Sequence, residues 1–156
     1  SYLPERTCIP TWMSVKQLLD FYRDFYRDFN RKAAEEMLTH LNIRLTQRIK
    51  QMSKGTREKV QLIMVMSRAA KLYLLDEPIG GVDPAARDYI LHTIISNYSK
   101  DATVILSTHL IGDIEPVLDE AIFLKDGRVF AHRSVEELRE TEGMSVDAYF
   151  REVFKC

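Results

Sequence analysis

The stretch of residues 72–78 constrains the fold of this chain more than any other part of the sequence. Four largely apolar residues form a run that is long enough for a buried strand and too short for an independent helix. Asp76 and Glu77 follow, and Pro78 prevents the strand from continuing. Because ligands of open α/β sheets bind beyond the carboxyl ends of the strands, we expect these two acids to face a bound ligand and take part in its chemistry. Taken alone, the same residues could also be a polar strand end that leads into a turn.

The two acids could play different roles at such a site. Asp76 would suit a hard cation such as Mg²⁺, which prefers oxygen ligands and keeps several waters. Glu77 would then be available to orient or deprotonate an attacking water.

The composition is that of one folded domain without a strongly charged partner. The chain has 156 residues, of which 46% are hydrophobic, and this is enough for a real core. The net charge of −1 gives no strong field, so we predict no nucleic-acid partner. No apolar run approaches a membrane span and no signal peptide is present, so we expect a cytosolic chain. Because the chain begins without Met, we expect it to be part of a longer protein.

The first part of the chain carries helical patterns. Ser14 and Gln17 form a capping box for a helix whose apolar stripe continues to Phe29. The residues before Ser14 have no clear period and are predicted to be a loop. A tandem Tyr-Arg-Asp-Phe repeat in residues 22–29 could be a stacking platform for nucleic acid. However, a four-residue step places like residues on nearly one helix face, which favours core packing.

Two more helices and a tight turn are expected before the chain reaches its middle. One helix covers residues 31–41, and another begins at Ser53 and should be buried because its middle is apolar nearly all round. After Glu77, two glycines permit an unusual turn. Asp83 is a good N-cap there, and Pro84 suits the first position of the next helix.

The rest of the chain alternates strands and helices. A buried strand over residues 103–106 ends at a Ser-Thr-His sequence, and this alternation predicts a parallel α/β organisation. Two short apolar runs flank Asp126-Gly127, which is a strong hairpin turn. Ser134 and Ser145 are expected to cap two terminal helices.

Four motifs stand in a fixed order along the chain. They are Met52-Ser53-Lys54-Gly55-Thr56, Leu75-Asp76-Glu77-Pro78, Gly81-Val82-Asp83-Pro84 and Ser107-Thr108-His109. Together they resemble the ATP-binding subunit of an ABC transporter, from its Q-loop to its C-terminus, over essentially the whole chain. The resemblance implies an α/β fold that is part of a P-loop NTPase domain. It further implies a helical subdomain in residues 1–70, core strands and a hairpin in residues 71–130, and a helical segment in residues 131–156.

The resemblance also assigns roles to the first two motifs. Ser53, Lys54, Gly55 and Thr56 lie in the counterpart of the LSGGQ signature, which holds the γ-phosphate of ATP bound to the partner subunit. A Ser hydroxyl, a glycine and a helix N-terminus together make an anion site. In the second motif, Asp76 would support Mg²⁺ and Glu77 would be the catalytic carboxylate.

The remaining assignments concern single residues. Asp83 resembles the D-loop aspartate at the dimer interface, and His109 resembles the switch histidine that contacts the γ-phosphate. Glu5 falls where the family often has its Q-loop glutamine, and a carboxylate there can still accept a contact from water or Mg²⁺.

The sequence departs from the family pattern in three ways. Lys54 replaces the first signature glycine and Thr56 replaces the glutamine, a form that looks like that of ABC-2-type exporter ATPases. Glu5 replaces the Q-loop glutamine. No GxxxxGK[ST] motif and no adenine-stacking aromatic residue are recognised. We therefore expect the chain to be the C-terminal part of an ATPase and to bind and hydrolyse little ATP by itself.

The resemblance implies ATP hydrolysis that drives export across a membrane. The implied partners are a transmembrane permease subunit and a second ATPase subunit, in a head-to-tail homo- or heterodimer. The implied location is cytoplasmic, peripheral on the inner face of the cell membrane. The loop that contains Trp12 is predicted to dock the permease, and a Trp12 packed within the domain is the alternative. A soluble ABC ATPase that acts on ribosomes or DNA, or a non-catalytic regulatory fragment, are the alternative functions.

Overall fold

The computed structural model divides the chain into two compact units, Ser1–Thr108 and His109–Cys156. It describes residues 1–80, 82, 84–98 and 101–154. The expected boundaries after residues 70 and 130 stay a prediction.

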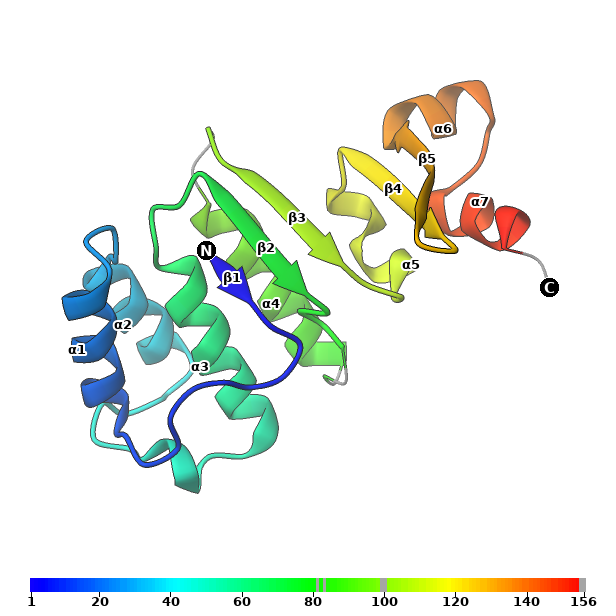
Figure 1. Cartoon of the computed structure of the whole chain (residues 1–156). Helices are drawn as coiled ribbons and strands as arrows, with labels where there is room; N and C mark the ends of the chain where they lie inside the picture. The colour runs from blue at the N-terminus through cyan, green and yellow to red at the C-terminus, as the bar shows by residue number, and fades with distance from the viewer. Residues whose placement is uncertain (81, 83, 99–100, 155–156) are drawn as a thin grey trace. The chain divides into compact units, whose positions relative to one another are not determined.

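Helices make up most of the first half of the first unit (Figure 1). They are α1 (Val15–Phe25), α2 (Arg31–His40), the short 3₁₀-helix η1 (Ile49–Gln51) and α3 (Lys54–Met66). Side chains of Ser14, Asn30 and Ser53 cap the three α-helices by accepting a backbone N–H from the first turn. The capping box predicted for Ser14 is present, and the last seven residues of α3 are all buried, as predicted.

Helix α1 is shorter than its apolar stripe predicts. It ends at Phe25, and Tyr26 is extended, with φ of −119° and ψ of 111°. The guanidinium of Arg68 lies 3.9 Å from the centre of the Tyr26 ring and pairs with Asp28 at 2.9 Å. Phe29 forms a β-bridge with Arg68. These contacts with a distant residue hold residues 26–29 outside the helix, although their apolar period would continue it.

The tandem aromatic repeat packs mainly into the core. Phe29 is buried, and Tyr22 and Tyr26 are partly buried against the cluster formed by α1, α2 and α3. Phe21 and Phe25 face outward, with their rings stacked 5.4 Å apart. The predicted use of the repeat in packing therefore holds for its inner face.

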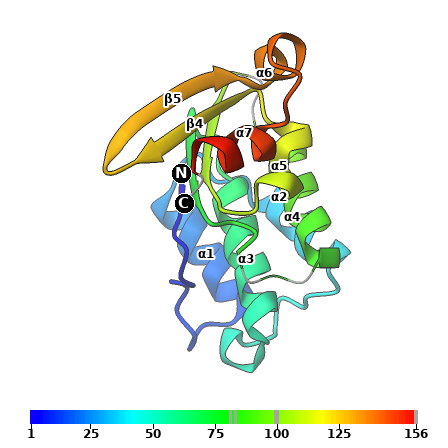
Figure 2. The same ribbon diagram turned by 90° about the vertical axis from the view of Figure 1, so that its right-hand side faces the viewer.

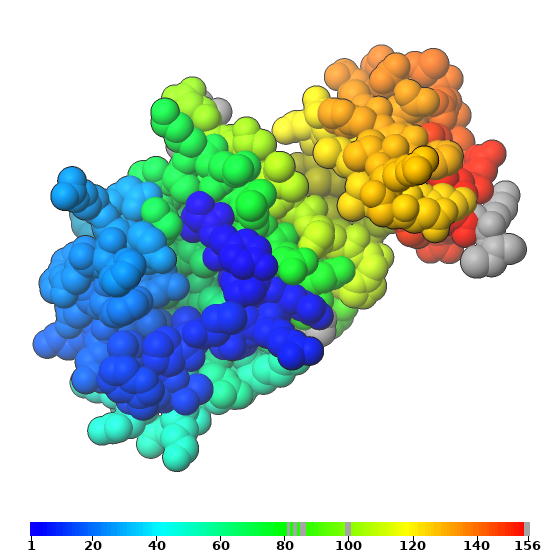
Figure 3. Space-filling model, in the orientation of Figure 1, coloured from blue at the N-terminus to red at the C-terminus, as the bar shows by residue number. Residues whose placement is uncertain are grey.

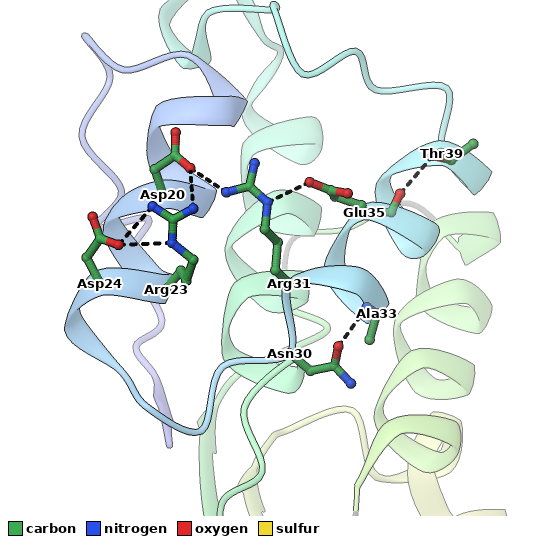
Figure 4. A network of polar contacts seen from close by, with 8 residues as sticks. All are labelled: Asp20, Arg23, Asp24, Asn30, Arg31, Ala33, Glu35 and Thr39. Carbon is green, nitrogen blue, oxygen red and sulfur yellow. Dashed lines mark hydrogen bonds and ion pairs between the residues drawn. The ribbon is translucent and has the colours of Figure 1, made fainter.

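A charged network joins α1 to α2 (Figure 4). Arg31 on α2 hydrogen-bonds Asp20 of α1, and its Nε donates to Glu35 at 2.7 Å. The hydrogen bond from Arg31 holds the pKa of Asp20 below its usual range, and the same contacts raise the pKa of Arg31. Because these side chains remain in contact with water, the network orients the two helices more than it stabilises them.

The first unit also contains a three-stranded parallel sheet. Its strands are β1 (Tyr2–Leu3), β2 (Leu72–Asp76) and β3 (Thr103–Ser107), in the order β1-β2-β3. Strand β1 lies in the segment that was predicted to be a loop, because a two-residue strand shows no alternation in the sequence. It forms through a distant pairing, in which Tyr2 is opposite Leu74.

Helices cover one face of this sheet. Helix α4 (Pro84–Asn97) and α3 lie on the same side of the strands (Figures 1 and 2). Tyr73 and Leu75 are buried, whereas Leu72 and Leu74, on the opposite face of β2, are 42% and 40% exposed. Figure 3 looks onto that opposite face of the unit.

The second unit is built around a hairpin. Its elements are α5 (Ile111–Ile114), η2 (Glu115–Val117), β4 (Glu120–Lys125), β5 (Arg128–Ser134), α6 (Val135–Thr141) and α7 (Val146–Val153). The predicted turn at Asp126-Gly127 is present, with positive φ at both residues. Ser134 and Ser145 cap α6 and α7 as predicted. The described residues thus have the α/β organisation and parallel sheet that the sequence predicts.

Candidate functional site

The end of β2 is fixed by the neighbouring strand. Asp76 lies opposite Ser107 in the parallel register of β2 and β3. The Ser107 hydroxyl donates a hydrogen bond of 2.6 Å to Oδ1 of Asp76. This short contact holds the Asp76 side chain in one orientation at the carboxyl edge of the sheet.

Glu77 has a left-handed backbone conformation, with φ of 45°. Its N–H donates to the backbone oxygen of Ser107 at 3.0 Å and to the Ser107 hydroxyl at 3.2 Å. Its carbonyl accepts the N–H of Gly80 at 3.0 Å. Such a conformation costs a residue with a side chain about 1–3 kcal/mol and persists only where the surroundings enforce it. Because strain of this kind gathers at functional sites, the geometry makes Glu77 a candidate for chemistry.

Gly80 allows the turn to close tightly over Glu77. A Cβ atom at residue 80 would lie 3.3 Å from both the Cβ and the carbonyl oxygen of Glu77, and 3.4 Å from its Oε2. Any larger residue would therefore press on the carboxylate that the turn positions.

The acids line a small cleft of about 30 Å³ in the first unit. Four acidic residues line it, Glu5, Glu58, Asp76 and Glu77, together with Gln61. This volume can hold a water molecule, which needs polar partners of this kind. The structure thus brings together three of the predicted site residues, Glu5, Asp76 and Glu77; their roles stay predictions.

The donor set of this cleft fits a magnesium ion that arrives with a nucleotide. Carboxylate oxygens are the ligands that Mg²⁺ prefers. Within the described part of the chain, no three His, Cys, Asp or Glu side chains could hold a metal ion by themselves. Mg²⁺ at nucleotide sites uses one or two carboxylates and completes its shell with phosphates and waters, so a partial protein site is what such an ion needs.

The signature-like segment forms the N-terminus of α3. The Ser53 hydroxyl accepts the N–H of Thr56 at 3.1 Å and lies 2.8 Å from the Thr56 hydroxyl. Lys54 is exposed, and its Nζ lies 3.7 Å from Glu58 Oε1. A Cβ atom at Gly55 would meet nothing within 4 Å. The fold therefore does not require a glycine here, and the backbone of Gly55 is open to a close approach from outside.

Besides the signature-like segment, two predicted site residues, His109 and Asp83, are not among the described residues that line the cleft. His109 begins the second unit, whereas Asp76 and Glu77 belong to the first. Asp83 lies outside the described residues. Their predicted contacts with the γ-phosphate and with the dimer interface stay predictions.

Ser107, which holds Asp76, and three residues of the cleft lining, Gly80, Glu58 and Gln61, were among those not predicted as site residues. Ser107 could be suspected only as the end of a strand, because the register that pairs it with Asp76 is not visible in one sequence. Gln61 does carry a signal, since it is the single polar residue in the buried run that ends α3.

Comparison with known proteins identifies the family. A family model described as "AAA domain, putative AbiEii toxin, Type IV TA system" matches residues 11–112, which is more than half of the chain. The chain belongs to this AAA-domain family. The matched region of this AAA-domain chain includes the signature-like segment, Asp76 and Glu77, and the end of β3, but not Glu5.

Curated relatives of this AAA-domain chain are ATP-binding proteins of ABC transporters. The ABC transporter ATP-binding protein YtrB of Bacillus subtilis (strain 168) is 26% identical over 140 residues, covering 89% of this chain and 48% of YtrB. The uncharacterized ABC transporter ATP-binding protein YxlF of the same strain is 27% identical, covering 93% of this chain and 50% of YxlF. The chain thus spans about half the length of these relatives.

A solved structure agrees with these relatives. The "Structure of ATP binding subunit of ABC transporter" matches with a TM-score of 0.84 and 26% identity, covering 99% of this chain and 68% of that chain. The resemblance to ABC transporter ATP-binding subunits that the sequence indicates, and the P-loop NTPase fold that it implies, are therefore confirmed.

Proposed function

We propose that this chain is the part of an ABC transporter ATPase that carries the Mg²⁺-supporting acid, the catalytic carboxylate and the signature segment. The observation that carries the proposal is the cleft of the first unit, where Asp76, the strained Glu77 and Glu5 meet. The full-length protein that contains this chain would hydrolyse ATP, and the phosphate-cradling loop would come from its remaining length.

Three acidic residues of the cleft, Asp76, Glu77 and Glu5, have defined roles in this proposal. Asp76, held by the Ser107 hydroxyl, supports Mg²⁺. When bound, Mg²⁺ neutralises the charge of the phosphates during transfer. The Glu77 carboxylate accepts a proton from the attacking water. Hydrogen bonds between its backbone and Ser107 and Gly80 hold this residue in position. Glu5 orients a water or a magnesium-bound water at the wall of the cleft.

The signature segment serves the ATP of a second ATPase subunit. Ser53 and the first amides of α3 form an anion site at a helix N-terminus. The open space beside Gly55 lets a γ-phosphate approach the backbone. Lys54 adds a positive charge near this position. Its ion pair with the Glu58 carboxylate holds the Lys54 ammonium group at the surface of α3. Two such subunits would pair head to tail, as a homo- or heterodimer, with Asp83 at the interface and His109 as the γ-phosphate sensor.

A transmembrane permease is the second proposed partner. Trp12 is 65% exposed, in a loop whose Thr11 and Met13 carbonyls accept N–H groups of Lys50 and Ile49. Tryptophan is enriched among the residues that anchor protein interfaces. Every helix among the described residues is too short or too polar to span a bilayer. We place the full-length protein on the inner face of the membrane through its permease, with its ATPase part in the cytoplasm.

Substitution of Glu77 tests the proposal in the full-length protein. Glu77→Gln keeps the size of the side chain but cannot accept a proton, so kcat should fall by about 10²–10⁴-fold while Mg-ATP binding is retained. Steady-state ATPase assays and calorimetric titration measure the two quantities. Glu36→Gln, which changes an exposed carboxylate of α2 away from the cleft lining, is the control and should keep most of the activity. Wild-type turnover in Glu77→Gln would show that another group is the base.

Mixed dimers test whether the signature segment acts across the interface. One subunit would carry Ser53→Arg and the other Glu77→Gln, which places both lesions in the same composite site and leaves the other site intact. Activity should then remain measurable. Both lesions on one subunit damage both sites and should abolish it. Equal activity in the two arrangements would refute the assignment of Ser53 to the opposite site.

A further inference from the structure

Gln61 is a buried amide in an apolar helix. It is 4% exposed, and the other six residues among the last seven of α3 are hydrophobic and buried. An amide in such a place costs stability unless hydrogen bonds satisfy it, and a leucine would fill the position without that demand. Gln61 should therefore form hydrogen bonds with groups that require both the donor and the acceptor of an amide.

Both ends of the Gln61 amide are used by the same segment of the chain. Its Oε1 accepts the backbone N–H of Cys8 at 2.6 Å, and its Nε2 donates to the backbone oxygen of Arg6 at 3.5 Å. Arg6 and Cys8 belong to the irregular segment that follows β1. A segment without ladder hydrogen bonds of its own thus obtains them from a side chain of α3.

The segment that Gln61 holds also carries Glu5. Glu5 and Gln61 line the same cleft as Asp76 and Glu77. Further along α3, in the N-terminal direction, Ser53 caps the helix. Eight residues separate Ser53 from Gln61, so the two positions are about 12 Å apart along the helix axis at 1.5 Å per residue. One rigid helix thereby carries both the signature cap and the anchor of the Glu5 segment.

We propose that Gln61 is a positioning residue that fastens residues 5–8 to α3, so that the Glu5 carboxylate stays at the cleft and moves with the signature helix. The first part, the anchoring of residues 5–8 by Gln61, concerns only the folded chain. The second part, an effect on hydrolysis through Glu5, rests on the proposed function. The two parts are tested separately.

Hydrogen exchange of the Cys8 amide tests the anchor on the chain itself. Gln61→Met removes both hydrogen bonds with little change in shape, and the Cys8 amide should exchange about tenfold faster, as the loss of one hydrogen bond predicts. Gln61→Glu keeps an acceptor of the same length, so protection of Cys8 should largely return. Gln51→Met, at an exposed position, is the matched control. Unchanged Cys8 exchange in Gln61→Met, or equal acceleration at all amides of α3, would overturn the anchor.

A double-mutant cycle in the full-length ATPase tests the effect through Glu5. Gln61→Met should lower kcat several-fold with Mg-ATP binding retained. Added to Glu5→Gln, it should lower kcat no further, because the group that it positions is already absent. Independent, multiplying losses would overturn the role in positioning Glu5. If the wild-type protein hydrolysed no ATP, the proposed function would fail, and so would this second part, while the exchange result on Cys8 would still decide the anchor.

Discussion

At the scale of single residues, Tyr22 shows what burial does to a side chain in this domain. Burial raises the pKa of Tyr22 to about 12, and the neighbouring Tyr26 adds to the shift. The Tyr22 ring packs against Tyr26 and Phe29, with ring centres 5.4 Å and 5.5 Å away. Because the folded state disfavours the phenolate, this contribution to stability is complete below the ordinary tyrosine pKa near 10 and is lost as the pH rises towards 12.

Alkaline unfolding tests this contribution. The free energy of unfolding should fall by about 1 kcal/mol more between pH 9 and pH 11 in the wild type than in Tyr22→Phe, which cannot titrate there. Urea denaturation followed by circular dichroism gives both values. Tyr98→Phe, at an exposed tyrosine, is the control and should keep the wild-type slope. An identical slope in Tyr22→Phe would contradict the raised pKa.

The sequence indicates which acidic residues come together at the cleft better than it indicates the contacts that hold them there. Asp76 and Glu77 follow a recognisable strand, and their type indicates their chemistry. The part played by Ser107 depends on which residue of β3 lies opposite Asp76, and one chain without its register does not contain that information. The tight packing at Gly80, where an added Cβ atom would lie 3.3 Å from Glu77, likewise arises only in the folded turn.

At the scale of elements, local signals predict where helices start, whereas distant contacts decide where α1 ends and whether β1 forms. Ser14, Ser53, Ser134 and Ser145 each cap a helix as predicted, because a cap is a contact within one turn. The early end of α1 depends instead on Arg68, which is far away in the chain. Strand β1 likewise exists only through its pairing with β2.

Glu115 is the side chain that ties the helical elements of the second unit together. It is 9% exposed; its Oε1 lies 3.3 Å from Arg139 of α6, and its Oε2 accepts the N–H of Asp147 in the first turn of α7 at 3.4 Å. Glu115→Ala should lower the free energy of unfolding by about 1–3 kcal/mol, because a helix N–H loses its acceptor. Chemical denaturation measures the change. Glu140→Ala, at an exposed site of α6, should have little effect, and equal losses in both variants would contradict this role.

At the scale of the whole molecule, the proposed permease contact can be tested separately from the ATP chemistry, because Trp12 does not line the cleft. Trp12→Ala should reduce the membrane-bound fraction of the full-length protein several-fold in cell fractionation while its ATPase activity persists, because an interface anchor is lost without a change in the cleft. Phe25→Ala, at an aromatic residue that is 71% exposed elsewhere in the same unit, is the control. A Trp12→Ala protein that binds membranes like the wild type would exclude this loop from docking.

The uncovered face of the parallel sheet has a consequence for how the isolated chain behaves in solution. Tyr2, Leu74 and Ile105 lie opposite one another across the three strands and are 58%, 40% and 49% exposed. Parallel sheets are normally covered on both faces, and an apolar strip of this kind favours association between molecules. A net charge of −1 supplies almost no repulsion to oppose it. Sulfate strengthens apolar association, so the chain should salt out at low ammonium sulfate, and its solubility should be governed by this strip rather than by its isoelectric point.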